Sequence, residues 1–316
     1  MAALQPVSWA PGDSKGYMED ISKKAPLMIT PTDAPFYKAL KKEKGSQVRH
    51  DWITDALGSN VVPSGVLYDA EPSYSTTDGR SRPYNWMQTF LEHWLVSRVS
   101  EIVSQRGGVA GVGSEVAHQI RKATELLGKK VERVLLSEQA DRDDDDSNAA
   151  LLGGFFHMVT TNVDDGGASD LAVYVTETKF QTALKTIYDA GCSNQVKVFC
   201  QTGFKSAVGT SFNGRTRVSE NVDRNSKAIN MVVDRYIPPV GPMVEIIPDR
   251  SMGAGIAIVD MEQCALVELA PLSVFRKDTD TRNRRGYVEQ ILTLKTGNET
   301  AHYAFRNDST PLAAGS

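Results

Sequence analysis

Cysteine is scarce in this sequence, and its three residues, Cys192, Cys200 and Cys264, form no C-x-x-C pair. Such spacing offers neither a disulfide framework nor a zinc site, and it favours a reducing compartment. Long apolar runs are also lacking, because none approaches the roughly 20 residues that a membrane span needs. The start, "MAALQPVSW", has neither the basic region nor the apolar core of a secretory signal. We therefore expect a soluble protein that is not exported by these routes.

Positive charge is not in excess either. Lys and Arg number 35 against 39 Asp and Glu, which gives a net charge of -4. A dedicated nucleic-acid binder needs a clear Lys and Arg surplus, so the sequence argues against that class. With 41% hydrophobic and 23% charged residues, the 316-residue chain has the composition of a folded protein. We expect one large domain or two closely connected ones, without internal repeats.

Signals of catalysis or nucleotide binding are weak. The segment Gly12–Gly16 matches the G-x-S-x-G pattern of a hydrolase nucleophile at Ser14. However, no strand is predicted ahead of it to make the strained turn that exposes such a serine. The loop Gly108–Gly113 has phosphate-loop glycine spacing, but Ser114 and Glu115 stand where Lys and Ser or Thr are required. We expect no catalytic residue and no cofactor, and interpret this loop as a flexible joint.

Metal binding is also not indicated. The acidic run Asp141–Asp146 can attract a hard cation, but it lacks the central glycine and the closing glutamate of an EF-hand loop. A solvated acidic loop is favoured over a calcium site. The scattered histidines lack metalloprotease spacing, and we expect surface or packing roles for His50, His93, His118, His157 and His302.

The N-terminal part of the chain predicts an arm. In "ITPTDAPFYKAL", Thr32 or Asp33 ahead of Pro35 predicts the capped start of a short helix. A helix this short cannot bury enough apolar surface to hold itself in place. We therefore expect residues 1–45 to be ordered by something other than themselves.

Two extended segments follow the arm. Residues 48–57 alternate like a strand, and residues 84–103 predict a second long strand that runs back beside the first. An isolated ribbon of this kind is marginal in water. Its tryptophans, Trp52, Trp86 and Trp94, either pack on each other across the ribbon or insert into a neighbouring chain, and the sequence favours the neighbour for part of the ribbon.

A long amphipathic helix is predicted from Ser114 to about Glu138, with Ser114 as its cap. Beyond the acidic run, short helices and strands alternate, including a helix that ends at Gly191 and a hairpin over 232–250. The last part predicts two long strands around Gly297 and Asn298. The apolar positions that carry the long helix are Val116, Ile120, Ala123, Leu127, Val131, Val134 and Leu135.

The stretch Arg276–Gly286 interleaves arginines with aspartates, as in "FRKDTDTRNRRG". It is either a solvated hairpin loop or a loop that pairs charges between symmetry-related copies, because Arg binds carboxylates through two hydrogen bonds. The sequence leaves both interpretations open.

The order of arm, ribbon, long helix, mixed lobe and returning strands resembles the Hong Kong 97-type major capsid proteins of tailed phages. The local sequence is similar to that of the branch typified by Escherichia phage SU-10 over about residues 20 to 308. The strings that carry this resemblance are "ITPTDAPF", "HDWITDAL", "YNWMQT", "VSEIVSQRGG", "LLGKKVERVLLS", "GGFFHMVTTN" and "VVDRYIPPVGPMVEIIPDR".

The resemblance implies an α+β capsid fold. It places an N-arm at 1–45, an extended E-loop hairpin at 46–105, a P-domain with its spine helix at 106–169, an α/β A-domain at 170–235, and returning A-domain and P-domain strands at 236–316. We expect contacts between subunits to include Phe36, Trp52, Trp86, Trp94, Arg276, Arg282, Arg284 and Arg285.

The resemblance also implies a structural protein rather than an enzyme. Such a chain assembles with copies of itself into pentamers and hexamers of an icosahedral phage head, in the host cytoplasm. It encloses double-stranded DNA through weak nonspecific contacts and has no membrane partner, while portal, scaffold and decoration proteins are further candidate partners. No extended N-terminal scaffold-like domain is present, so any scaffold is expected to be a separate protein, and no residue match transfers the family's covalent cross-link.

Two rival functions remain open from the sequence. An encapsulin-like shell around an enzyme cargo keeps the same fold. A soluble α/β hydrolase or nucleotide-binding enzyme would use Ser14 or the loop Gly108–Gly113.

Overall fold

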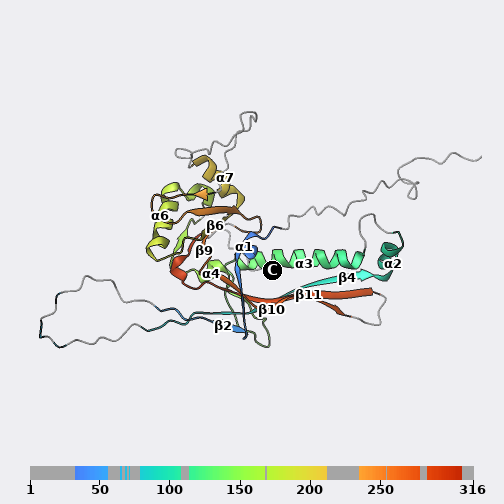
Figure 1. Ribbon diagram of the computed structural model, residues 1–316. Helices are drawn as coiled ribbons and strands as arrows, with labels where there is room; N and C mark the ends of the chain where they lie inside the picture. Colours follow the sequence, from blue (N-terminus) through green and yellow to red (C-terminus); the bar gives the residue numbers. More distant parts are fainter. Residues whose placement is uncertain are drawn as a thin grey trace, which may run out of the picture. The chain divides into compact units, whose positions relative to one another are not determined.

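The computed structural model in Figure 1 describes residues 33–55, 65, 68–69, 71, 79–107, 114–167, 169–211, 235–253, 255–277 and 283–307. The chain divides into two compact units. The smaller includes Glu92–Thr124 and Val274–Val288, and the larger includes Thr32–Leu91, Glu125–Ser273 and Glu289–Ser316.

The helices of the described residues are α1 (Pro35–Ala39), α2 (Arg98–Gly107), α3 (Glu115–Leu135), α4 (Phe155–Met158), α5 (Leu171–Tyr174), α6 (Glu177–Asp189), α7 (Thr202–Ser211) and the 3-10 turn η1 (Glu299–Ala301). The strands are β1 (Lys41–Lys44), β2 (Arg49–Asp51), β3 (Tyr84–Trp86), β4 (Gln88–Ser97), β5 (Val163–Asp165), β6 (Val196–Cys200), β7 (Arg235–Tyr236), β8 (Val244–Pro248), β9 (Gly255–Asp260), β10 (Ala265–Lys277), β11 (Asn283–Lys295) and β12 (Tyr303–Arg306).

The larger unit contains a six-stranded sheet in the order β5-β12-β9-β6-β8-β7. Its central strand β9 is buried at every position. Alternate residues of a strand point to opposite faces, so Ile256 and Ile258 enter one core while Ala257 and Val259 enter the other. The sheet therefore separates two cores within this unit.

Helix α6 lies beside the six-stranded sheet (Figure 1) and contributes its apolar face to one of these cores. Thr176 caps it by accepting from the Lys179 backbone N–H at 3.4 Å. Its buried face contains Phe180 and Leu184, at helical spacing. Beyond its end, Gly191 has a φ of 84°, which an L-residue rarely adopts. This confirms the predicted stop at Gly191.

A second sheet has the order β1-β10-β11-β4, in which β10 and β11 form a long hairpin (Figure 1). Helix α3 confirms the predicted amphipathic helix, although it ends at Leu135 rather than near Glu138. Its positions Leu127, Val131 and Leu135 are fully buried. The hydroxyl of Ser114 accepts from the Ala117 N–H at 3.5 Å, as expected for a cap.

The predicted strand over 84–103 is wrong as a single element. It comprises β3 and β4, and the chain then turns into α2. The hydroxyl of Ser97 accepts from the Ser100 N–H at 3.2 Å, which supports the start of this helix. The first predicted strand is also shorter, because within its described residues 48–55 strand pairing is confined to β2 and a single bridge between Thr54 and Ser81.

The second long strand expected at the end is also wrong. Gly297 has a φ of 54°, and Asn298 accepts from the Thr300 N–H at 3.2 Å to begin η1. In the described part of the chain after η1, the four residues of β12 pair in the sheet, antiparallel to β9 and parallel to β5. Local hydrogen bonding by Asn298 therefore outweighs the alternating pattern.

The smaller unit has its own apolar cluster, formed by Trp94, Val96, Ala123 and Val288. Gly286 lies against this cluster, and a Cβ atom on it would collide with the Phe275 carbonyl oxygen and the Trp94 ring. Glycine is therefore the residue that lets the indole approach the backbone of β11.

Candidate intersubunit surfaces

The short helix α1 is held by a side chain from α3. The carboxyl of Glu132 accepts from the Phe36 N–H at 2.7 Å and from the Tyr37 N–H at 2.6 Å. The sequence correctly predicts Pro35 in the first turn of the helix, but the N-cap position is Ala34 and Asp33 does not cap it, while Thr32 lies outside the described residues. A distant carboxyl satisfies the free N–H groups instead.

Glu132 is fully buried and lies beside a second buried carboxyl, Asp249, which is 1% exposed. Burial raises the pKa of Glu132 to about 8, and the adjacent Asp249 acts in the same direction. Burial also raises the pKa of Asp249. Sequence reasoning missed this pair, because a lone charged residue in an amphipathic helix usually faces solvent.

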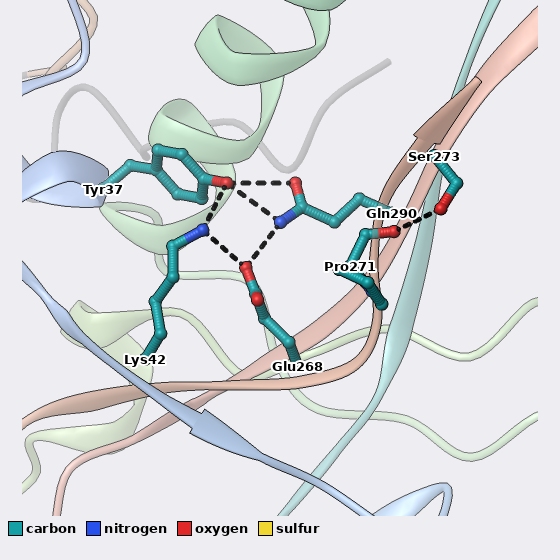
Figure 2. A network of polar contacts seen from close by, with 6 residues as sticks. All are labelled: Tyr37, Lys42, Glu268, Pro271, Ser273 and Gln290. Carbon is teal, nitrogen blue, oxygen red and sulfur yellow. Dashed lines mark hydrogen bonds and ion pairs between the residues drawn. The ribbon is translucent and has the colours of Figure 1, made fainter.

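A second set of polar contacts, separate from those of Glu132, holds α1 and β1, as Figure 2 shows. Gln290 donates to the Tyr37 hydroxyl at 2.9 Å and to the Glu268 carboxylate at 2.8 Å. Lys42 donates to Glu268 at 2.7 Å, and its ammonium lies 5.0 Å from the centre of the Tyr37 ring. The strand β1 pairs in parallel with β10, so Lys42 and Glu268 come from neighbouring strands.

The last part of the predicted arm is held by the body of its own chain rather than by a neighbouring subunit. Phe36 is fully buried and lies edge-on to Phe155 and Phe199, with ring centroids 6.3 Å and 5.0 Å away. The described residues 33–45 therefore pack on their own chain. Residues 1–32 lie outside the described part.

The base of the ribbon, β2 and β3, is also tied to the chain. Asp51 pairs with Arg49 at 2.8 Å and with Arg82 at 2.8 Å, and the hydrogen bonds from Arg49 lower the pKa of Asp51. The buried Asn85 donates to the carbonyls of Gly153 and Leu294 at 3.1 Å and 2.8 Å. The base is thus held in place by its own chain. Most of residues 56–78 lie outside the described part.

The three ribbon tryptophans have different environments. Trp52 and Trp94 are 8% and 5% exposed, and both are buried by this chain itself. Trp86 is half-buried, with the guanidinium of Arg49 5.7 Å from its ring centre and the Tyr84 ring 6.3 Å away. Trp86 is therefore the one of the three with surface available to a neighbour.

The arginine-rich hairpin end belongs to the smaller unit. Arg276, Arg284 and Arg285 are exposed, whereas Arg282 lies outside the described residues. Arg284 pairs with Glu101 of α2 at 3.3 Å. Stacking of Phe275 on Tyr287, with centroids 5.1 Å apart, stiffens the hairpin just before its end.

Exposed apolar side chains gather on elements that sequence reasoning did not single out. In the smaller unit, Val99 and Ile102 on α2 are exposed. In the larger unit, Ile237, Val240 and Met243 are exposed between β7 and β8. The apolar sequence "IPPVGPM" is unusual for a hairpin loop, and it could have indicated the second group of exposed apolar residues.

The remaining candidate sites from the sequence lie partly outside the described residues. Ser14 and Gly108–Gly113 lie outside the described residues. In the acidic run, Asp145 accepts from Ser147 and Asn148 N–H groups, both at 2.7 Å. Across the described ranges, no cluster of three or more His, Cys, Asp or Glu is arranged to hold a metal, and no helix has the length and apolarity to cross a membrane.

Comparison with protein families identifies the family to which the chain belongs. The model of the SU10 major capsid protein family matches residues 12–308. The chain belongs to this family. It is therefore a phage major capsid protein, a structural component of the virion, and the family match does not favour the encapsulin-like alternative. No curated protein matches the chain in sequence.

Solved capsid structures show the same fold at low identity. The capsid of a native GTA particle has a TM-score of 0.66 at 14% identity, covering 96% of this chain and 99% of that one. The capsid of cyanophage A-1(L) gives 0.65 at 12% identity, with 90% and 96% covered. That of cyanophage P-SCSP1u gives 0.61 at 10%, with 94% and 95% covered. The chain thus has the Hong Kong 97-type capsid fold.

Proposed function

We propose that this chain self-assembles into the pentamers and hexamers of an icosahedral phage head that encloses double-stranded DNA, and that assembly takes place in the bacterial host cytoplasm. The observation that carries the proposal is the family match over 12–308. Many modest contacts, repeated by symmetry, hold such a shell together. The role is structural, without enzymatic turnover or a cofactor.

The segments have distinct roles in this proposal. Residues 1–45 act as the N-arm, 46–105 as the E-loop, 106–169 as the P-domain with its spine helix, 170–235 as the A-domain, and 236–316 return through both domains. Residues 1–32 reach neighbouring subunits, while 33–45 fix the point from which they leave, since Phe36 is buried in its own chain.

The proposed contact residues divide by exposure. Trp86, Arg276, Arg284 and Arg285 touch a neighbour directly, because they have surface to offer. Phe36, Trp52 and Trp94 are buried and act by positioning the segments around them. Arg282 contributes with the same hairpin end.

Charge supports loose retention of the genome. A net charge of -4 leaves no surplus to bind phosphates tightly, so packaged DNA is held by weak nonspecific contacts and by the closed shell. Portal, scaffold and decoration proteins are further partners of the assembled head.

Sedimentation velocity of the full-length chain over a range of concentrations tests the proposal. We expect a slow species at low concentration and fast particles above a threshold, because closed lattices form cooperatively. A single slow species at every concentration would contradict the proposal. Particles recovered from cells with a folded enzyme inside, rather than nuclease-protected DNA, would support the encapsulin-like alternative.

A further inference from the structure

The four-stranded sheet ends in two edge strands that are built differently. In the order β1-β10-β11-β4, the outer strands are β1 and β4, and among the described residues no other strand pairs with the outer edge of either. Such an edge presents a row of backbone N–H and C=O groups to which a strand of another chain can bind. The length and the side chains of an edge strand decide how readily it pairs.

The strand β1 has the features that resist pairing. It has four residues, all of them exposed, and three are lysines. Short edge strands that carry lysine seldom join another sheet, because pairing would crowd like charges and remove ammonium groups from water. The β1 edge of the sheet is therefore protected.

The strand β4 lacks this protection. It has ten residues, contains neither lysine nor proline, and carries a single charged side chain, that of Glu92. Exposure alternates along it, since Phe90, Trp94 and Val96 are buried while the residues between them are accessible. Leu95 is 64% exposed. A long edge of this kind, with an exposed leucine beside it, is typical of a strand that is covered by another chain.

The part of β4 in the smaller unit, Glu92–Ser97, is fixed from its inner side. Trp94 and Val96 belong to the apolar cluster of this unit. A strand already held in place loses little conformational freedom when another strand binds it. Because alternate side chains point to opposite faces, three exposed positions lie on the other face. They are His93, Leu95 and Ser97.

A second copy of this chain is the partner that suits this edge. The chain is a capsid protein, and every copy carries the same open strand. Antiparallel pairing of two such strands about a two-fold axis covers both edges through one contact, whereas a different strand would leave its own edge to be covered. An axis perpendicular to the sheet also keeps the buried faces of both sheets on the same side, as the wall of a closed shell requires.

The side chains favour one register within this part of β4. Directly opposite residues of antiparallel strands share a face, so exposed positions meet exposed positions. With the axis at Leu95, the two leucines meet each other and His93 lies opposite Ser97. An axis at Trp94 or Val96 would place Leu95 against a polar side chain instead. An axis at His93 would oppose two imidazole rings.

We propose that two copies of this chain join their sheets through antiparallel pairing of β4 with β4, about a two-fold axis at Leu95. This contact rests on the proposed self-assembly and names one of the surfaces through which it takes place. Each contact is short, so it contributes modestly by itself and gains its effect by repetition through the shell.

Cysteine cross-linking of the full-length chain tests the register. Directly opposite residues of antiparallel strands have Cα atoms about 4.5–5.5 Å apart, within the reach of a disulfide. Under mild oxidation, Leu95→Cys should give disulfide-linked dimers, and a mixture of His93→Cys with Ser97→Cys should cross-link the two variants. His93→Cys alone should give at least about tenfold less dimer, since its copy lies about 13 Å along the strand.

Two controls accompany the cross-linking. Val99→Cys is matched in exposure, because Val99 is 68% exposed and lies in α2 rather than in the strand, and it should give little dimer. The native chain measures the background from its own thiols, of which Cys192 is half-buried and Cys200 and Cys264 are buried.

A substitution that gives β4 the protection of β1 tests the effect on assembly. Leu95→Lys places two ammonium groups next to each other at the axis, and should raise the concentration needed for particle formation by about tenfold or more. The free energy of unfolding of the unassembled chain should stay nearly unchanged, because the side chain is exposed. Val99→Lys is the matched control and should leave the concentration threshold in place.

Several results would overturn the proposal. Equal dimer yields from Leu95→Cys and Val99→Cys would indicate random collision, and an equal effect of the two lysine variants would assign the loss to added charge. Normal particles that contain no Leu95→Cys dimers would remove the edge contact while leaving self-assembly intact. If the native chain forms no particles, the proposed function fails, and cross-linking of the concentrated chain still decides the contact: dimers of Leu95→Cys support it and their absence refutes it.

Discussion

Trp52 donates its indole N–H to the carbonyl oxygen of Gly297 at 2.9 Å, which ties the base of the ribbon to the turn after β11. A tryptophan that the sequence suggests as an anchor into a neighbour is therefore an anchor within the chain. Trp86, which lies opposite Arg49 in the antiparallel pairing of β2 and β3, is half-buried and has surface to offer.

This difference predicts that one of two matched substitutions mainly lowers the stability of the chain and the other mainly impairs assembly. Trp52→Ala removes a buried ring and its hydrogen bond, and should lower the free energy of unfolding of the unassembled chain by about 3–5 kcal/mol. Trp86→Ala should lower it by no more than about 1.5 kcal/mol, yet raise the concentration needed for particle formation. Urea unfolding and sedimentation measure the two effects, and the reverse ranking would count against a contact of Trp86 with a neighbour.

Gly286 predicts a steric effect in the smaller unit. Gly286→Ala places a Cβ against the Phe275 carbonyl and the Trp94 ring, and should cost about 1–3 kcal/mol of unfolding free energy. Gly128→Ala is the control, because a Cβ at this position in α3 meets no atom and should add up to about 1 kcal/mol through helix propensity. Equal thermal midpoints for the two variants would refute the close approach of Trp94.

Two truncations separate the parts of the N-arm. Deleting residues 1–32 should leave a folded chain that fails to close shells, because its body, including α1, remains intact. Deleting residues 1–40 also removes Phe36 from the core and takes both N–H donors from Glu132, so the free energy of unfolding should fall by at least about 3 kcal/mol. Normal shells from the shorter truncation would refute the proposed role of 1–32.

Buried thiols predict a pattern of alkylation. Burial raises the pKa of Cys200 to about 12 and also raises that of Cys264, so both remain thiols at neutral and mildly alkaline pH. Iodoacetamide should modify them only after denaturation, whereas the half-buried Cys192 should react first in the native chain. Mass spectrometry reads the order, and early modification of Cys264 would contradict the core around it.

Much of the fold could be predicted because the spacing of apolar residues and the residues that begin or end helices agree with the observed packing. Helix α3 has its apolar face at Leu127, Val131 and Leu135, and α6 has both a Thr176 cap and a Gly191 stop. Where a local hydrogen bond competes with the pattern, prediction fails. Ser97 begins α2 inside an apparent strand, and Asn298 begins η1 inside another.

The contacts that hold α1 could not be predicted from local sequence. Glu132 and Phe36 are 96 residues apart, and only the folded chain brings the carboxyl to the helix. The environment of a single aromatic residue could not be predicted from the sequence either, since Trp52 and Trp86 look alike in sequence but differ in burial. The family resemblance, by contrast, needed only the order of short strings, and the family match confirms it.

Electron microscopy of particles formed by the purified full-length chain tests the central claim most directly. We expect closed shells in which pentamers sit at the vertices and hexamers between them, with the β10–β11 hairpin ends and the ribbons overlapping between subunits. A chain that remains a separate, compact particle at high concentration, or that forms only open irregular sheets, would contradict the account.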